Sequence, residues 1–136
     1  MAATLKLEIV TPEAKVFSED VEMVSLTGVD GDMGIYPEHM PLMTQLVAGE
    51  VIARKNASDI SLAVGDGFVQ VTGERVAILT DMAIKADDID EAAAQQALQK
   101  AEARLSQKLS DEEAATVEAA VAHATAQIKV KQRNRK

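Results

Sequence analysis

Apolar and polar residues alternate along short runs through the first two thirds of the chain. Turn-forming residues separate these runs, and all seven glycines and all three prolines of the chain fall before residue 88. Short alternating runs divided by glycine turns are typical of antiparallel β-structure, in which strands bury one face. We therefore expect an antiparallel β-sandwich or barrel over residues 1–87. The apolar positions of these runs include Leu5, Leu7, Ile9, Ile60, Leu62, Val64, Val69, Val71, Val76 and Ile78.

The pattern changes near residue 88, after which there is no glycine or proline. Residues 91–128 hold 13 alanines among 38 positions, and alanine has the highest helix propensity. A helix should begin near Asp88 or Asp90, because aspartate caps helix N-termini. Ser110 and Glu113 form the capping-box pattern of a second helix. Residues 88–136 are thus predicted to form an antiparallel helical hairpin. Its expected core-facing positions are Leu98, Ala101, Leu105 and Leu109, then Ala114, Val117, Val121, Ala124 and Ile128.

Three of these nine core-facing positions are alanine, which limits how firmly the hairpin can pack. Burial stabilises by roughly 0.8 kcal/mol per CH2 group, so an alanine gains far less than a leucine. High helix propensity combined with weak packing predicts a hairpin that can detach and remain helical.

Composition excludes several classes of function. Aromatic residues make up only 2% of the 136 residues and the net charge is −8, whereas nucleic-acid binding needs cations and stacking platforms. There is no cysteine, so disulfides and thiolate metal sites are excluded. The N-terminus does not resemble a signal peptide, and no run approaches the roughly 20 apolar residues of a spanning helix. We expect a cytoplasmic protein that reaches a membrane only through a partner.

Positive charge is concentrated at the C-terminus. Residues 1–128 carry 22 acids and 9 bases, while the last eight residues carry five bases and no acid. This tail is either a solvated end that complements the helix dipole or a basic probe for an acidic surface. The cations are Lys129, Lys131, Arg133, Arg135 and Lys136.

Candidate chemistry centres on residues 28–42, GVDGDMGIYPEHMPL. Asp30 and Asp32 suggest a calcium loop, but Gly34 stands where that motif needs Asp or Asn. The only histidines, His39 and His123, lie in different halves of the chain. No phosphate-binding loop or nucleophile elbow is present. The sequence therefore indicates a binding or regulatory module with no metal, although an enzyme with a site built from scattered residues stays open.

The segment Met33–Leu42 resembles the L-G-I-Y-P-x-H-x-P-L signature of the epsilon subunit of rotary proton-translocating ATP synthases. The runs 7–12, 24–28 and 67–71 resemble strands of the same family. The resemblance implies a non-catalytic subunit of the central rotor. Its β-sandwich would bind the gamma subunit and the polar loops of the c-ring. Its hairpin would fold onto the sandwich or extend into the alpha/beta catalytic head and inhibit ATP hydrolysis.

The resemblance also assigns partner contacts in the signature segment and at the residue just before it. Asp32 matches the acidic position that faces the c-ring loops, and His39 matches the signature histidine at the rotor-facing part of the sandwich. The alternative for His39 is a packed histidine that is hydrogen-bonded between two turns. The expected partner-binding residues are Asp32, Met33, Gly34, Ile35, Tyr36, Pro37, His39 and Pro41.

The hairpin raises two further expectations from the same resemblance. His123 and Gln127 stand where relatives often carry basic residues that meet the acidic loop of the beta subunits, so inhibition should depend on the five terminal cations instead. The ATP-binding motif of some bacterial relatives matches at Ile89 and Asp90, but Ala93 replaces its arginine. A methyl group cannot bind phosphate oxygens, so we expect ATP to bind weakly or not at all.

Two other interpretations follow from the same residues. The chain could be a nucleotide-sensing module that uses the hairpin, with Lys100 and Arg104 as its remaining cations. It could also be the equivalent mitochondrial subunit, although the absence of an Arg- and Ser-rich leader favours a bacterial protein. We therefore expect a peripheral protein at the cytoplasmic face of the bacterial inner membrane, without direct insertion.

Overall fold

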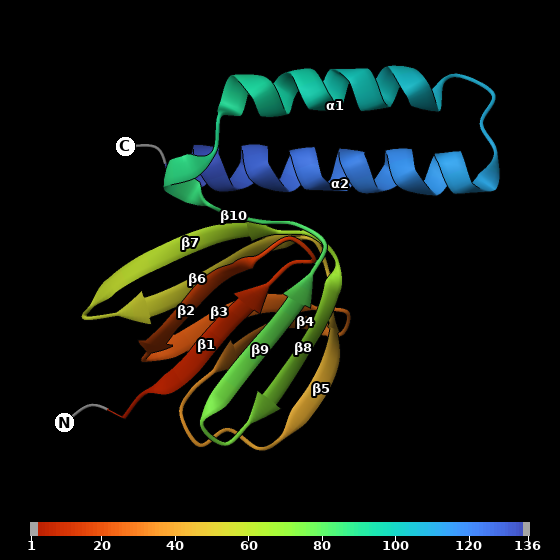
Figure 1. Ribbon diagram of the computed structural model, residues 1–136. Helices are drawn as coiled ribbons and strands as arrows, with labels where there is room; N and C mark the ends of the chain where they lie inside the picture. Colours follow the sequence, from red (N-terminus) through yellow and green to blue (C-terminus); the bar gives the residue numbers. More distant parts are fainter. Residues whose placement is uncertain (1–2, 135–136) are drawn as a thin grey trace.

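The computed structural model describes residues 3–134 and consists of a β-sandwich followed by two helices (Figure 1). Ten strands precede a short 3-10 helix, η1 (Ala86–Asp88). Among the described residues, no helix is both long enough and apolar enough to cross a membrane. The strands are β1 (Leu5–Val10), β2 (Lys15–Val21), β3 (Met23–Gly28), β4 (Gly31–Ile35), β5 (Leu42–Leu46), β6 (Gly49–Lys55), β7 (Ser58–Val64), β8 (Gly67–Thr72), β9 (Arg75–Thr80) and β10 (Ala83–Lys85).

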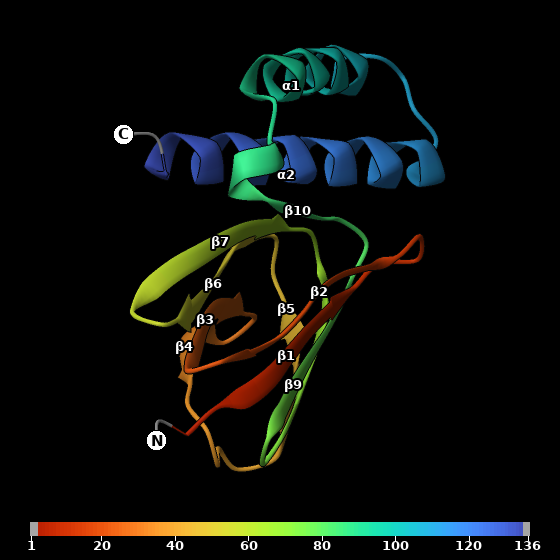
Figure 2. The same ribbon diagram turned by 60° about the vertical axis from the view of Figure 1, so that its left-hand side comes forward.

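All ten strands belong to one sheet that curls around a single core (Figures 1 and 2). Nine of them follow the order β10-β7-β6-β3-β5-β8-β9-β1-β2, and β4 pairs with β3. The predicted β-sandwich or barrel is confirmed, but its strands are not all antiparallel. β1 runs parallel to β9, with Leu7 opposite Val76 and Ile9 opposite Ile78. The two strands lie near opposite ends of the β-domain sequence. No hairpin turn connects them, so they are not constrained to run antiparallel.

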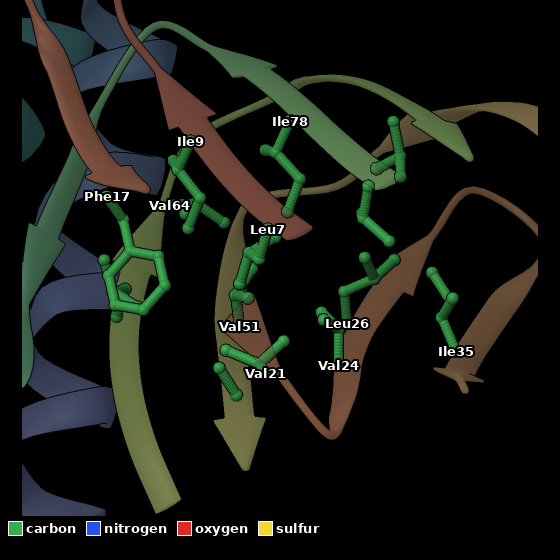
Figure 3. Packing of buried hydrophobic residues seen from close by; sticks show 14 of the residues in the cluster. Leu7, Ile9, Phe17, Val21, Val24, Leu26, Ile35, Val51, Val64 and Ile78 are labelled. Carbon is green, nitrogen blue, oxygen red and sulfur yellow. The ribbon is translucent and has the colours of Figure 1, made fainter. Parts of the chain in front are cut away.

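The alternating apolar residues fill the interior of the sandwich (Figure 3). Leu7, Ile9 and Ile78 are each 0% exposed, and each buried side chain of this size stabilises the fold by about 1.5–3 kcal/mol. Every residue of this cluster comes from the strands. The core therefore closes without any contribution from the helices.

The two helices begin where local capping predicts. Helix α1 (Glu91–Leu105) starts after Asp90, whose Oδ1 accepts a hydrogen bond from the Ala93 N–H at 3.1 Å. Helix α2 (Asp111–Arg133) starts after Ser110, which forms the predicted capping box with Glu113. The helices pack along each other in an antiparallel hairpin (Figures 1 and 2).

The packing of the hairpin differs from the expected stripes in two ways. Leu105 is 42% exposed, so its predicted core position is wrong: α1 ends there and no neighbouring turn covers the side chain. Helix α2 has a second buried face, on which Ala126 and Val130 meet Ala63 and Ile89 beneath the hairpin. Helix α2 therefore lies between α1 and the sandwich (Figure 2).

Candidate interaction surfaces

The signature segment, Met33–Leu42, begins within β4 of the β3–β4 hairpin, whose turn is closed by Gly28 opposite Gly31. Gly31 adopts a φ of +122°, which glycine tolerates and other residues rarely adopt. Across this hairpin, the Thr27 hydroxyl on β3 donates a hydrogen bond to Asp32 Oδ1 on β4 at 2.8 Å. Asp32 is exposed, so its charge is held at the surface by a local contact.

The next residues form a type II turn. The N–H of His39 donates to the carbonyl of Tyr36 at 3.2 Å, Pro37 occupies the second turn position, and Glu38 has a φ of 67°. The Glu38 N–H also donates to the carbonyl of Gly73 at 2.8 Å, which ties this turn to the β8–β9 turn. Pro37 restricts the backbone conformation of this turn even in the absence of a partner, and the Glu38–Gly73 hydrogen bond fixes the turn against the β8–β9 turn.

The predicted contact residues divide into exposed and buried members. Tyr36 is 62% and Met40 is 79% exposed. Ile35 is 0% exposed and belongs to the core, so it supports the segment from within and its side chain is not part of the free surface. His39 is half-buried and its Nδ1 lies 2.7 Å from the carbonyl of the neighbouring residue Met40, so this contact lies within the segment and does not join two turns. Met33 and Pro37 are half-buried, and Gly34 and Pro41 are exposed.

A second exposed surface lies on the outer face of β5, β8 and β9. Phe68 is 56% exposed and pairs with Leu79, which is 55% exposed. Met43, 67% exposed, pairs with Gln70 on the same face, one outward-facing position along from the Gln45–Phe68 pair. We call Met43, Phe68 and Leu79 the apolar strip. Adjacent exposed apolar side chains of this size mark interaction surfaces more often than isolated ones do.

The hairpin is docked on the sandwich through the end of α2. The Arg133 guanidinium donates two hydrogen bonds of 2.6 Å to the Glu50 carboxylate on β6 and a third of 3.1 Å to Ser61 Oγ on β7. The hydrogen bond with Glu50 raises the pKa of Arg133 above its usual value. Asn134 adds a 3.2 Å bond to the same carboxylate. We call Glu50, Ser61, Arg133 and Asn134 the terminal clamp.

The basic tail is therefore partly engaged in this docked state. The Lys131 ammonium donates to the carbonyl of Ala86 at 3.2 Å, while Lys129 is exposed. Arg135 and Lys136 lie outside the described residues. The interpretation of the tail as a purely solvated end is wrong for Lys131 and Arg133, because both contact the β-domain or its linker.

Comparison with known proteins places both halves of the chain in one family. The β-sandwich domain of the ATP synthase delta/epsilon chain matches residues 4–86, and the long α-helix domain of the same chain matches residues 87–132. This chain belongs to the ATP synthase delta/epsilon family. The resemblance detected in the signature segment is thereby confirmed over nearly the whole sequence.

Curated relatives agree with this assignment. The chain is 44% identical to the ATP synthase epsilon chain of Dehalococcoides mccartyi strain BAV1 over 135 residues, which covers 98% of this chain and 96% of the relative. It is 42% identical to the epsilon chain of Desulforamulus reducens over 129 residues, with 95% and 98% coverage. These two epsilon chains therefore align with this chain over nearly their whole length.

Solved structures share the fold at lower sequence identity. A chain in the Euglena gracilis mitochondrial ATP synthase, a structure comprising OSCP, F1 and the c-ring, matches with a TM-score of 0.76 and 21% identity. The match covers 96% of this chain and 82% of the other. A chain of the Tetrahymena thermophila mitochondrial central stalk and c-ring matches with a TM-score of 0.56, 15% identity, and 91% and 96% coverage.

The residues that match the family's ATP motif do not form a phosphate-binding cluster in the docked state. Ile89 is 4% exposed in the seam below α2, and Asp90 is used as the α1 cap. Lys100 is exposed, and Arg104 lies 3.4 Å from the Glu113 carboxylate. The hollow beside this motif, about 280 Å³, is lined largely by alanines, with His123 and Gln127 as its polar members. Weak or absent ATP binding stays a prediction.

Two of these candidate surfaces, the apolar strip and the terminal clamp, were not predicted from the sequence. The apolar strip has a readable signal, because Val69 and Val71 are buried and their alternation places Phe68 outward. The terminal clamp has no such signal, since Glu50 and Arg133 are separated by 83 positions. In the part of the chain that the structure describes, no group of three or more potential metal ligands comes together.

Proposed function

We propose that this protein is a non-catalytic subunit of the central stalk of an F-type ATP synthase. In this role it joins the gamma subunit to the c-ring during proton-driven ATP synthesis, and its hairpin restrains ATP hydrolysis. The main support is a rigid sandwich that exposes two separate contact surfaces, in a chain that belongs to the delta/epsilon family.

We assign the signature segment to the c-ring loops. Its turn, residues 36–41, lies next to the β8–β9 turn at the end of the barrel opposite the hairpin (Figures 1 and 2), and it offers the side chains of Tyr36 and Met40. The exposed carboxylate of Asp32 lies at the opposite end of β4, across from Thr27, and would add to this surface from the side of the barrel. Polar loops of a membrane ring would meet both hydrogen-bonding and apolar groups here. Because the type II turn is already fixed, binding would lose little conformational entropy.

We assign the apolar strip to the gamma subunit. Met43, Phe68 and Leu79 would be covered by a partner in the assembled rotor, which explains why a protein of this size leaves them at the surface. The subunit would then be held at the cytoplasmic face of the bacterial inner membrane as a peripheral protein, through gamma and the ring rather than by insertion.

We assign the regulatory role to the hairpin and its basic tail. The apolar contact of α2 with the β-domain rests on small residues such as Ala63, Ala126 and Val130, so release would expose little apolar surface. An extended hairpin would carry the terminal cations towards the alpha/beta catalytic head and its acidic loop.

The test is ATP hydrolysis by a catalytic head from the same organism from which this subunit has been removed. The full chain should bind and slow hydrolysis. A chain ending at Asp87 should bind without slowing it, because the sandwich core contains no helical residue. A double variant, Phe68→Ser and Leu79→Ser, should bind gamma more weakly than Lys6→Ser, an exposed control on β1. Failure of the full chain to bind would overturn the proposed function.

A further inference from the structure

A second polar contact joins the hairpin to the sandwich, near the middle of α2. His123 Nε2 lies 3.0 Å from Asp81 Oδ1, in the turn between β9 and β10. The His123 side chain is 27% exposed and that of Asp81 is 49% exposed. The pair therefore sits at the edge of the docking seam, where solvent protons can reach it.

The backbone beneath the pair leaves space for this contact. A Cβ atom on Gly65 would lie 2.0 Å from Asp81 Oδ1 and 2.7 Å from His123 Nε2. Gly65 is held in place by the bond from its N–H to the Met82 carbonyl at 2.8 Å. The His123–Asp81 pair thus rests directly against the end of β7, and a side chain at position 65 would displace one of its two members.

The charges around His123 are acidic. The β9–β10 turn contributes Asp81. The β7–β8 turn contributes Asp66, whose carbonyl accepts the Asp81 N–H at 3.3 Å and whose carboxylate accepts a hydrogen bond from the Ala48 N–H at 3.0 Å. Helix α1 contributes only alanines to the hollow beside His123, and α2 contributes alanines and Gln127. None of these neighbours is a cation, so none opposes a positive charge on the imidazole.

We propose that His123 and Asp81 form a pH-sensitive latch that holds the hairpin more tightly on the sandwich as pH falls. A histidine changes charge between about pH 5 and 8, whereas aspartates stay ionised over that range. The neutral imidazole offers one hydrogen bond, and the imidazolium adds an attraction to the carboxylate. This attraction exists only in the docked state, so protonation of His123 favours docking and its loss at higher pH favours release.

The terminal clamp provides an internal reference for this latch. Glutamate and arginine side chains ordinarily titrate outside pH 5.5 to 8, so the ion pair of Arg133 with Glu50 should stabilise docking equally across this interval. The latch rests on the docked arrangement alone. It does not depend on whether the released hairpin inhibits ATP hydrolysis.

The test measures how often the seam opens in the isolated full-length chain. The sequence contains no cysteine, so Ala126→Cys places a single thiol in the buried seam, where Ala126 is 5% exposed. The rate of thiol labelling is measured at pH 5.5 and 8.0. Each rate is divided by the rate for the same chain unfolded in denaturant at the same pH, which removes the effect of thiol ionisation. The divided rate should rise about two- to fivefold at pH 8.0, as expected for a partly exposed ion pair.

Three variants in this background identify the group responsible. His123→Gln keeps a hydrogen-bonding amide but cannot change charge, so the rise with pH should disappear. Asp81→Asn should also remove it. Glu50→Gln should speed labelling at both pH values and leave the rise intact. A rise that persists in His123→Gln, or one that is lost in Glu50→Gln, would overturn the proposal. A divided rate that is the same at pH 5.5 and pH 8.0 in the Ala126→Cys chain itself would also overturn the proposal.

Discussion

At the scale of single residues, the most informative polar group is Glu8, a carboxylate buried on the outer side of β1. It is 5% exposed because Lys15 from β2, at 2.8 Å, and Arg75 from β9 cover it. The hydrogen bond from Lys15, followed by the charge of Arg75, holds the pKa of Glu8 below its usual value. Glu8 therefore connects the antiparallel β1–β2 pair with the parallel β1–β9 pair.

This arrangement predicts how stability depends on acid. Since the pKa of Glu8 is lower in the folded than in the unfolded chain, its contribution is present above the unfolded pKa and is lost as pH falls through the folded pKa. The free energy of unfolding, measured with urea between pH 6 and 3, should decrease on acidification. Glu8→Gln should be less stable at pH 6 and should lose less stability on acidification.

The matched control is Glu19→Gln, which removes a carboxylate on β2 that pairs with Lys55. Its side chain is 36% exposed, and exposed pairs contribute little, so stability at pH 6 should change much less than in Glu8→Gln. Equal effects of the two substitutions would show that burial between two cations does not distinguish Glu8.

At the scale of elements, the sequence predicts local features well and long-range ones poorly. Asp90 and Ser110 could be identified as caps because their partners, Ala93 and Glu113, are three residues away. The signature segment could be located because its turn chemistry is also local. The direction of β9 beside β1 and the second buried face of α2 depend on contacts between distant segments. The sequence around Ala126 does not indicate whether that face of α2 packs against α1 or against the sheet.

The β6–β7 hairpin gives an element-scale prediction. Lys55 pairs with Ser58 across a two-residue turn in which Asn56 and Ala57 have φ values of 54° and 65°. This is the type I′ arrangement, which prefers Asn-Gly. An L-residue in this region costs about 1–2 kcal/mol, while glycine adds about 0.4–1 kcal/mol of unfolded-state entropy. Ala57→Gly should therefore raise the free energy of unfolding by up to about 1 kcal/mol.

A substitution that should have the opposite effect on stability serves as the control for that turn. Ala57→Val places a β-branched residue at positive φ and should destabilise the chain, while the exposed position excludes a packing effect. Urea unfolding of the three chains should give the order Gly, Ala, Val. Any other order would indicate that the turn does not keep positive φ at residue 57 in solution.

At the scale of the whole molecule, two bodies of unequal packing are joined by a narrow seam. The sandwich has a closed core of large aliphatic residues, whereas the hairpin meets it through Ala63, Ile89, Ala126 and Val130 and through polar contacts. We expect the hairpin to move as a unit, because the sandwich packs tightly within itself while the attachment consists of a small apolar cluster and a few polar contacts. The attachment then decides which surface of α2 is available.

Glu50 has a particular place in this balance, because it occupies Arg133 while the hairpin is docked. The acidic residue of the sandwich and an acidic surface of the catalytic head would compete for the same guanidinium. Glu50→Gln removes the charge that holds it, and the released population should rise about two- to fivefold for a contact of this exposure. Less subunit should then be needed for half-maximal inhibition of the depleted catalytic head, whereas the exposed control Glu74→Gln should leave the requirement unchanged.

Replacing the five terminal cations with glutamine should weaken inhibition, the opposite of the effect expected for Glu50→Gln, even though it also weakens docking. The cations are Lys129, Lys131, Arg133, Arg135 and Lys136. If inhibition needed only a released hairpin, the variant with all five cations replaced would inhibit as well as Glu50→Gln or better. If the cations themselves contact an acidic surface, release without them should give little or no inhibition. Hydrolysis assays of the two variants at equal occupancy of the catalytic head separate these cases, and unchanged inhibition after the fivefold replacement would exclude the basic tail as the inhibitory contact.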